Sequence, residues 1–201
     1  MKRRSLLTLA AAASLSPLSP AASCAEPPKA VRVRVETALG AFVLELDAER
    51  APITVGNFLR YVDARLLDGG SVYRIVSESN QPATVKHRIE VVQWGMHHAD
   101  DKPTPFPPIA HETTQKTGLR HRDGTISMAR TQPGSASSEF FICIGDQPAL
   151  DFGGQRNPDG QGFAAFGRVV EGMDVVRALH ARAQARDWLD APIAVRSVRR
   201  L

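Results

Sequence analysis

The chain has 201 residues, of which 43% are hydrophobic, and this is enough for one domain with a sizeable core. Its formal net charge is +4, but the first 25 residues contribute three basic and no acidic side chains. The rest of the chain carries 22 basic and 21 acidic side chains. This near balance gives no support for a nucleic-acid partner, which would require a basic surface.

Residues 1–25 have the three parts of a secretory signal. Basic residues near the start precede an apolar run at 6–18, and the small residues Ser23 and Ala25 mark a cleavage site. The apolar run is shorter than the ~20 residues that span a bilayer as a helix. We therefore expect a signal peptide at 1–25, a mature domain at 26–201 with no membrane span, and a periplasmic location.

Two other fates of this segment stay open. Arg3 and Arg4 begin a weak twin-arginine pattern, and Cys24 could carry a lipid anchor. Ala21 is a poor residue three positions before a lipid-bearing cysteine, so we favour simple cleavage. Cleavage would leave Cys143, within an apolar run, as the only cysteine, and we expect no disulfide.

Alternating apolar residues predict strands at both ends of the mature domain. Valines alternate with charged residues at 31–35, and a second alternating set at 42–46 follows a turn at Gly40. Apolar residues alternate again at 193–198, although the spacing slips by one near Ser197. Strands with one apolar face are typical of a closed antiparallel β barrel.

Two stretches have the spacing of amphipathic helices, one starting near Pro52 and one near Met173. We expect each to cap one end of the barrel. Between them, residues 97–116 are rich in proline and polar side chains, which predicts a long surface loop. The two apolar stripes are Val55, Phe58, Leu59 and Val62, and Met173, Val176, Leu179 and Ala183.

The region 124–144 reads G-T-I-S-M-A-R-T-Q-P-G-S-A-S-S-E-F-F-I-C-I, which predicts a strand, a surface loop and a second strand. It resembles the signature hairpin of the cyclophilin peptidyl-prolyl isomerases, whose two strands are like I-S-M-A and Q-F-F-I. The resemblance covers about residues 30 to 200 and implies a mostly β fold: a closed eight-stranded antiparallel β barrel capped by two α helices. The other segments that resemble the family, in family order, are 51–62, 72–76, 89–95 and 163–173.

The resemblance implies that Arg74, Gln93 and Phe141 are catalytic. A guanidinium stays charged and carries several N–H donors in a rigid fork, so Arg74 would stabilise the twisted amide of an X-Pro bond. Gln93 would bind the substrate carbonyl and orient Arg74. Phe141 would form the floor of the proline pocket, and Phe140 would face the opposite side of the strand and lie in the core.

The same resemblance implies a set of substrate-binding residues. Val91, Leu150 and Phe163 would form the walls of the proline pocket. Ala129 and Arg130 lie where the family binds the peptide through backbone groups. The role of the Arg130 side chain is open, because the family commonly has asparagine there.

Glu139 completes the predicted substrate-binding set and departs most sharply from the family, which usually has glutamine. A glutamate facing Arg74 would form a bidentate ion pair that either fixes the guanidinium or competes with the substrate for its donors. The residues alone leave both roles open. We expect moderate to low isomerase activity.

Further departures surround the predicted pocket. The polar stretch Ser77–His87 is an insertion beside the groove, where it would serve as a flap or gate. The family's aromatic pocket residue falls on or near Ile89 or Glu90, and neither is aromatic. Ala149 stands where many eukaryotic members have tryptophan, which implies weak binding of cyclosporin-type macrocycles.

Other chemistries have less support. The serines at 135–138 lack the strand-turn-helix context of a hydrolase nucleophile, and the glycines at 153–162 lack a dinucleotide-binding spacing. Polar residues near the long loop lack the spacing of a metal site, so we expect neither metal nor cofactor. The residues in question are His97, His98, Asp100, Asp101, His111 and Glu112.

The sequence therefore predicts a monomeric, cofactor-independent peptidyl-prolyl isomerase that acts on proline-containing polypeptides and assists folding in the periplasm. A function from another class stays open: a binding module with the same fold and weak or no catalysis. Both bind proline-containing peptides, and only turnover separates them.

Overall fold

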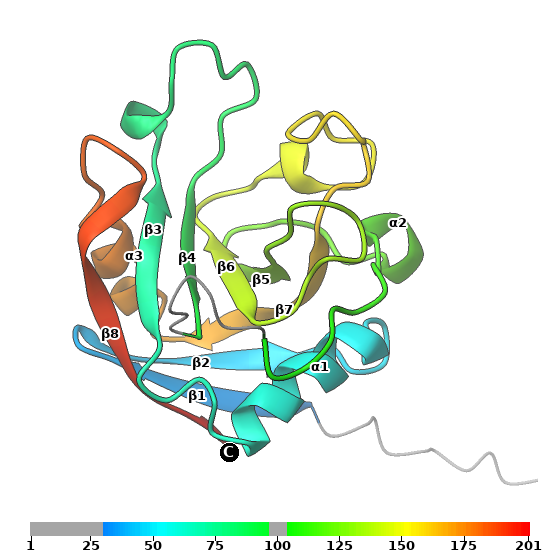
Figure 1. Ribbon diagram of the computed structural model, residues 1–201, viewed down its shortest axis with the longest axis vertical. Coiled ribbons are helices and arrows are strands. Elements are labelled where there is room, and N and C mark those ends of the chain that lie inside the picture. The colour runs from blue at the N-terminus through cyan, green and yellow to red at the C-terminus, as the bar shows by residue number, and fades with distance from the viewer. Residues whose placement is uncertain (1–29, 97–103) are drawn as a thin grey trace, which may run out of the picture.

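Eight antiparallel strands close into a barrel in the computed structural model, which describes residues 30–96 and 104–201 (Figure 1). Around the barrel the strands follow the order β1-β2-β7-β5-β6-β4-β3-β8. The predicted fold class is confirmed. The strands are β1 Val31–Thr37, β2 Gly40–Leu46, β3 Ser71–Val76, β4 Val91–Gly95, β5 Thr125–Met128, β6 Glu139–Cys143, β7 Ala164–Glu171 and β8 Trp188–Arg200.

The barrel interior holds the main hydrophobic core. Val33 and Leu44 of the first hairpin are 0% exposed, as the alternating pattern predicts. Phe58 reaches into the interior from helix α1 and contacts Trp94 and Phe140 edge-on, with ring centroids 6.2 and 4.9 Å apart. Such aromatic contacts add to the free energy gained by removing apolar area from water.

Two longer helices and one short helix accompany the barrel in the described ranges: α1 Pro52–Asp63, α3 Met173–His180 and α2 Thr114–Thr117. α1 buries the whole predicted apolar stripe, and α3 buries Val176 and Leu179. Ala183 lies beyond the end of α3 and packs against the core. The short 3-10 helices η1 Glu78–Asn80 and η2 Pro148–Leu150 complete the elements. No described helix is long and apolar enough to cross a membrane.

The slip in the last strand is a β-bulge. Val35 of β1 pairs with Val198, but two residues further along β1 Thr37 pairs with Val195, so Arg196 is the extra residue. The bulge returns Val195 and Val198 to the same inward face, where they are 1% and 0% exposed. The irregular spacing in the sequence therefore has a structural cause.

The prediction that 97–116 forms a surface loop is wrong for its last part. Thr114 starts helix α2 and is 0% exposed, and Glu112 is 8% exposed. The Glu112 carboxylate accepts hydrogen bonds from the backbone N–H of Ile53, at 3.2 Å, and from the backbone N–H and hydroxyl of Thr54, both at 2.7 Å. Helix α1 has no side-chain cap from its own N-cap residue, so this distant carboxylate supplies the cap.

Replacing Glu112 with alanine is expected to destabilise the protein by about 1–3 kcal/mol, because it leaves buried donors at the start of α1 without an acceptor. Urea unfolding monitored by circular dichroism measures the change. Glu49→Ala, which removes an exposed glutamate close to the same helix, is the control and should cost less than about 0.5 kcal/mol. Equal losses for the two variants would contradict the capping role.

Candidate active site

A second apolar cluster lies on the outer face of the barrel wall. Along β6, Phe140 and Ile142 belong to the interior core, whereas Phe141 and Cys143 belong to the second cluster. β4 divides in the same way, because Val92 belongs to the core and Val91 to the second cluster. The buried members of this outer cluster are Val76, Ile89, Val91, Phe141, Cys143 and Leu150, with Ala129, Ala149 and Phe163 packed against them.

The outer cluster brings together residues predicted to form the proline pocket. Phe141, which is 4% exposed, contacts the Phe163 ring edge-on at 5.4 Å. The Phe163 backbone N–H donates to the Leu150 carbonyl at 2.9 Å, which ties two of the predicted walls together. Val91 lies beside Phe141 because β4 and β6 are paired. The arrangement fits a pocket with Phe141 as its floor.

His121 supports Phe141 and was not predicted. Its ring stacks on Phe141 at 6.0 Å, while Nδ1 lies 2.8 Å from Asp151 Oδ1 and Nε2 lies 2.9 Å from Ser127 Oγ. Burial lowers the pKa of His121, so its ring is neutral near pH 7. The three side chains have the order of a hydrolase triad, but Ser127 is 0% exposed and closed off from substrate. They hold the His121 ring in place against Phe141.

Arg74 of β3 lies within a chain of hydrogen bonds that joins β3, β4 and Asp187, the residue just before β8. Its Nε donates to Asp187 Oδ2 at 2.8 Å, and its Nη1 donates to Gln93 Oε1 at 3.0 Å. The Gln93 amide Nε2 donates in turn to the Tyr73 hydroxyl at 2.6 Å. The predicted catalytic pair Arg74 and Gln93 is thus in direct contact. Asp187 and Tyr73 are additional members that the sequence did not indicate.

A β-bulge at Tyr73 makes this geometry possible. Val72 pairs with Trp94 and Arg74 pairs with Gln93, so Tyr73 is the extra residue on β3. Consecutive residues of a regular strand face opposite sides, whereas a bulge allows both Tyr73 and Arg74 to reach Gln93. The ring of Trp188, the first residue of β8, stacks on Tyr73 at 5.3 Å and covers it from the solvent side, with 56% of Trp188 exposed.

Glu139 does not form the ion pair with Arg74 that we considered from the sequence. The carboxylate that pairs with Arg74 is Asp187, at 2.7 Å from Nη2. Burial raises the pKa of Glu139 to about 7, although hydrogen bonds from Tyr73 and Ser138 oppose this shift. Glu139 is therefore joined to Arg74 only indirectly, through the hydrogen bonds of Tyr73 and Gln93.

The Arg130 guanidinium is hydrogen-bonded to two partners, the Gly162 carbonyl and the Asp159 carboxylate. It donates to the Gly162 carbonyl at 2.6 and 2.8 Å and to both oxygens of Asp159 at 2.8 and 2.9 Å. The guanidinium also lies 5.1 Å from the centroid of the Phe163 ring. Its side chain is 1% exposed, and its contacts tie the end of β5 to the loop before β7 and hold it against the Phe163 ring.

The insertion Ser77–His87 stands at the top of Figure 1 and is fastened at its base. The buried Gln81 side chain donates to the carbonyls of Ser77, at 2.8 Å, and Ile89, at 3.0 Å. Arg156, from the loop before β7, donates to Gln81 and to the His87 carbonyl. Ile89 belongs to the outer cluster, so an aliphatic residue stands at this edge of the cluster.

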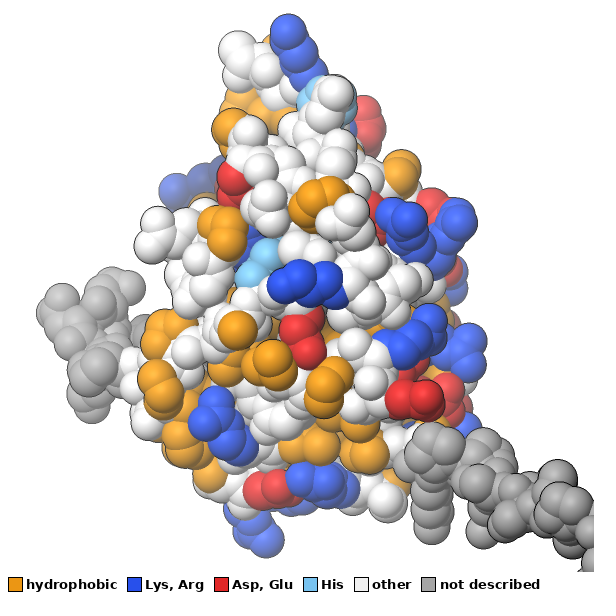
Figure 2. Space-filling model, turned by 90° about the vertical axis from the view of Figure 1, so that its right-hand side faces the viewer, with side chains coloured by type: hydrophobic (Ala, Val, Ile, Leu, Met, Phe, Trp, Pro, Cys, Tyr) orange, Lys and Arg blue, Asp and Glu red, His pale blue; other side chains and the backbone are white. Residues whose placement is uncertain are grey.

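Polar groups elsewhere do not form a metal-binding cluster in the parts of the chain that the structure describes. These residues contain no group of three or more histidine, cysteine, aspartate or glutamate side chains placed to hold a metal. His97, His98, Asp100 and Asp101 lie outside the described residues, and His111 Nε2 lies 3.2 Å from the Gln161 carbonyl. On the face seen in Figure 2, basic side chains lie next to acidic ones.

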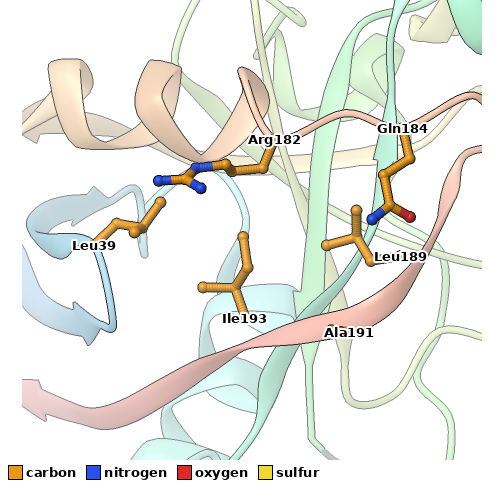
Figure 3. A pocket seen from close by; sticks show the side chains of 6 residues that line it. All are labelled: Leu39, Arg182, Gln184, Leu189, Ala191 and Ile193. Atoms are coloured by element: carbon orange, nitrogen blue, oxygen red, sulfur yellow. The ribbon is translucent and has the colours of Figure 1, made fainter.

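A hollow of about 210 Å³ lies between the end of α3, the β1–β2 turn and β8 (Figure 3). The Arg182 guanidinium extends across it toward Leu39. It contains none of the predicted site residues. The hollow is lined by Leu39, Arg182, Gln184, Leu189, Ala191 and Ile193.

Comparisons with known proteins identify the family of this chain. Residues 32–200 match the family model described as cyclophilin type peptidyl-prolyl cis-trans isomerase/CLD. The peptidyl-prolyl cis-trans isomerase cyp18 of Streptomyces antibioticus is 36% identical, over 80% of this chain and 91% of its own length. Peptidyl-prolyl cis-trans isomerase A of Dickeya dadantii is also 36% identical, over 87% of this chain and 83% of its own. The chain therefore belongs to the cyclophilin family of peptidyl-prolyl isomerases.

Solved structures agree on the fold. A cyclophilin type peptidyl-prolyl cis-trans isomerase of Cryptosporidium parvum superposes with a TM-score of 0.68 at 18% identity, covering 86% of this chain and 98% of its own. The same protein in the presence of the dipeptide Ala-Pro gives a TM-score of 0.64 at 19% identity, covering 83% of this chain and 96% of its own. At this low identity the likeness establishes the barrel and not the details of the pocket.

The raised pKa of Glu139 predicts a specific pH dependence of stability. Between pH 4.5 and about 7 the folded protein keeps a proton on Glu139 that the unfolded chain releases, so the free energy of unfolding should fall as the pH rises through this window. Glu139→Gln stays neutral and should lack this decline. The variant should gain on the order of 2–3 kcal/mol relative to the parent between pH 4.5 and 7.5, at about 1.4 kcal/mol per pKa unit.

Urea unfolding of parent and variant at several pH values within this window measures the effect. Glu171→Gln, at an exposed position of β7, removes the same charge and is the control. Parallel stability curves for the parent and Glu139→Gln would show that the Glu139 carboxyl titrates in its ordinary range.

Proposed function

We propose that the protein catalyses cis-trans isomerisation of X-Pro bonds in exported polypeptides and acts as a monomer in the bacterial periplasm. The observation that supports catalysis best is the position of Arg74, held by Asp187 and Gln93 beside the outer cluster that contains Phe141. The family to which the chain belongs supports the same activity.

The reaction requires no nucleophile and no cofactor. Rotation about an X-Pro bond has a barrier of about 18–20 kcal/mol, because the nitrogen lone pair is delocalised into the carbonyl. Twisting the bond ends this delocalisation and makes the nitrogen a hydrogen-bond acceptor. An apolar pocket that holds the proline ring, with a fixed donor beside it, therefore lowers the barrier.

The hydrogen bonds of Arg74 leave donors for this task. A guanidinium has five N–H groups, and two of them donate, Nε–H to Asp187 and one N–H of Nη1 to Gln93, while Nη2 lies 2.7 Å from Asp187 Oδ2 in an ion pair. At least one N–H remains on each terminal nitrogen. The Arg74 side chain is 27% exposed, so substrate can reach it. The proline ring would lie on Phe141, with Val91, Leu150 and Phe163 around it.

A proline-peptide binding module with weak catalysis is the second candidate function. The observation that favours it is the carboxylate of Asp187 on Arg74, because an ion pair reduces the charge available to the transition state. NMR exchange spectroscopy on a short Ala-Pro peptide, with and without the protein, separates the two. Catalysis appears as exchange between cis and trans signals, whereas a binding module only shifts and broadens them.

Arg74→Ala should lower kcat/KM for such a peptide about 100-fold, because it removes the donor to the twisted amide. The fold should persist, since the side chain is not part of either hydrophobic cluster. Arg186→Ala removes an exposed arginine of the nearby α3–β8 connection and should retain the parent activity. The proposal fails if Arg74→Ala retains activity within twofold of the parent while folded.

The location is tested by the N-terminus of the protein made in a bacterial host. Cleavage after Ala25 predicts a periplasmic product that begins at Glu26, has the mass of the unmodified chain and contains Cys143 as a free thiol. Cell fractionation followed by intact mass spectrometry measures this. A mass that includes acyl chains on Cys24 would instead indicate a membrane-anchored lipoprotein.

A further inference from the structure

We propose that Asp187 is the positioning residue for Arg74: its carboxylate fixes the guanidinium so that the remaining N–H groups face the substrate. The inference rests on the isomerase function proposed above and adds a residue to its site. The carboxylate need not contact the substrate and acts through Arg74.

The geometry of the pair supports this role. Nε and Nη2 of Arg74 both lie close to one oxygen, Asp187 Oδ2, at 2.8 and 2.7 Å. Gln93 accepts from the third nitrogen, Nη1, at 3.0 Å. All three guanidinium nitrogens are thus engaged from two directions, which fixes both the position and the plane of the group. A single acceptor would leave it free to rotate.

Asp187 is itself held by the barrel. The Ile75 backbone N–H donates to the Asp187 carbonyl at 2.7 Å, and the following residue, Trp188, pairs with Arg74 across β3 and β8. Trp188 also stacks on Tyr73, the residue next to Arg74. The carboxylate is therefore anchored to the same strand that carries the guanidinium.

The insertion adds a second anchor for the segment that precedes Asp187. The Asn80 side chain donates to the carbonyl of Gln184 at 3.2 Å and to that of Ile75 at 2.8 Å. The Gln184 side chain accepts from the Asp190 backbone N–H at 3.0 Å. The connection between α3 and β8 is thereby joined to both β3 and the insertion, which links the Ser77–His87 stretch to the position of Arg74.

A fixed guanidinium is better for this reaction than a mobile one. An arginine side chain has many rotamers, and each turnover would otherwise require it to reach the twisted amide and give up water. Donors that are already oriented need no such reorganisation. The carboxylate accepts from Nε and lies 2.7 Å from Nη2, so its attraction orients the group without using every N–H.

The test compares Asp187→Ala and Asp187→Asn with a matched control, Asp190→Ala. The control removes a carboxylate three residues further along the chain, which pairs with Arg186 and not with Arg74. NMR exchange with an Ala-Pro peptide gives kcat and KM for each variant. We expect Asp187→Ala to lower kcat about tenfold with KM within twofold of the parent. Asp187→Asn retains one acceptor oxygen and should be intermediate, and the control should match the parent.

The same Asp187 substitution in the Arg74→Ala background identifies the route of the effect. If Asp187 acts through Arg74, the double variant should have the turnover of Arg74→Ala alone. A further tenfold loss in that background would overturn the inference. Parent-like or higher turnover of Asp187→Ala would overturn it as well, since the carboxylate would then be dispensable or inhibitory.

A readout without turnover separates this inference from the proposed function. The Arg74 Nε–H signal in ¹⁵N NMR, assigned by its loss in Arg74→Ala, should exchange slowly with water in the parent and at least tenfold faster in Asp187→Ala. Unchanged exchange would overturn the positioning role. A parent that shows this protection but no peptide turnover would instead overturn the isomerase function and leave the positioning of Arg74 in place.

Discussion

The structure depends on the fact that one wall of the barrel is apolar on both faces. In β4 and β6, alternate residues face either the interior or the outside. Here the outside of this wall is covered by the loop before β7, 3-10 helix η2 and the base of the insertion. Removing both faces from water makes the wall rigid, because a close-packed side chain such as Phe141 has little freedom to move.

The polar part of the site is held by hydrogen bonds and not by apolar packing. Five side chains, from Glu139 through Tyr73, Gln93 and Arg74 to Asp187, form one chain of hydrogen bonds with a carboxylate at each end. Partial burial strengthens such contacts and makes unpaired groups costly. The two carboxylates differ in environment. Glu139 is buried enough to have a raised pKa, whereas Asp187 is 28% exposed and pairs directly with the guanidinium.

This arrangement changes how the glutamate at position 139 is interpreted. From the sequence, a negative charge near a catalytic arginine suggests direct competition. In the structure the charge is separated from Arg74 by a hydroxyl and an amide. It lies over Gly95 of β4, where a Cβ atom would be only 2.5 Å from Glu139 Oε2. The strand thus leaves space for the carboxylate at the one residue without a side chain.

The sequence by itself determined the barrel and the two longer helices, because these depend on local periodicity and on motifs of adjacent residues. The resemblance to the cyclophilins also named Val91, Phe141, Leu150 and Phe163, which the structure gathers in the outer cluster. Even the bulge in β8 left a trace in the spacing near Ser197. Catalytic roles for Arg74, Gln93 and Phe141 remain predictions.

Only the tertiary structure decided which polar groups meet. Asp187 is 113 residues from Arg74, and Glu112 is 58 residues from Thr54, and both lie in stretches without a periodic pattern. A carboxylate in such a stretch looks like any solvated surface charge, because its partner is selected by how the chain closes. The bulge at Tyr73 could not be predicted for the same reason. It arises where β3 pairs with β4 and β8, and this pairing exists only in the closed barrel. Hydrogen bonds of this kind depend on distance and direction in space, which local sequence patterns do not specify.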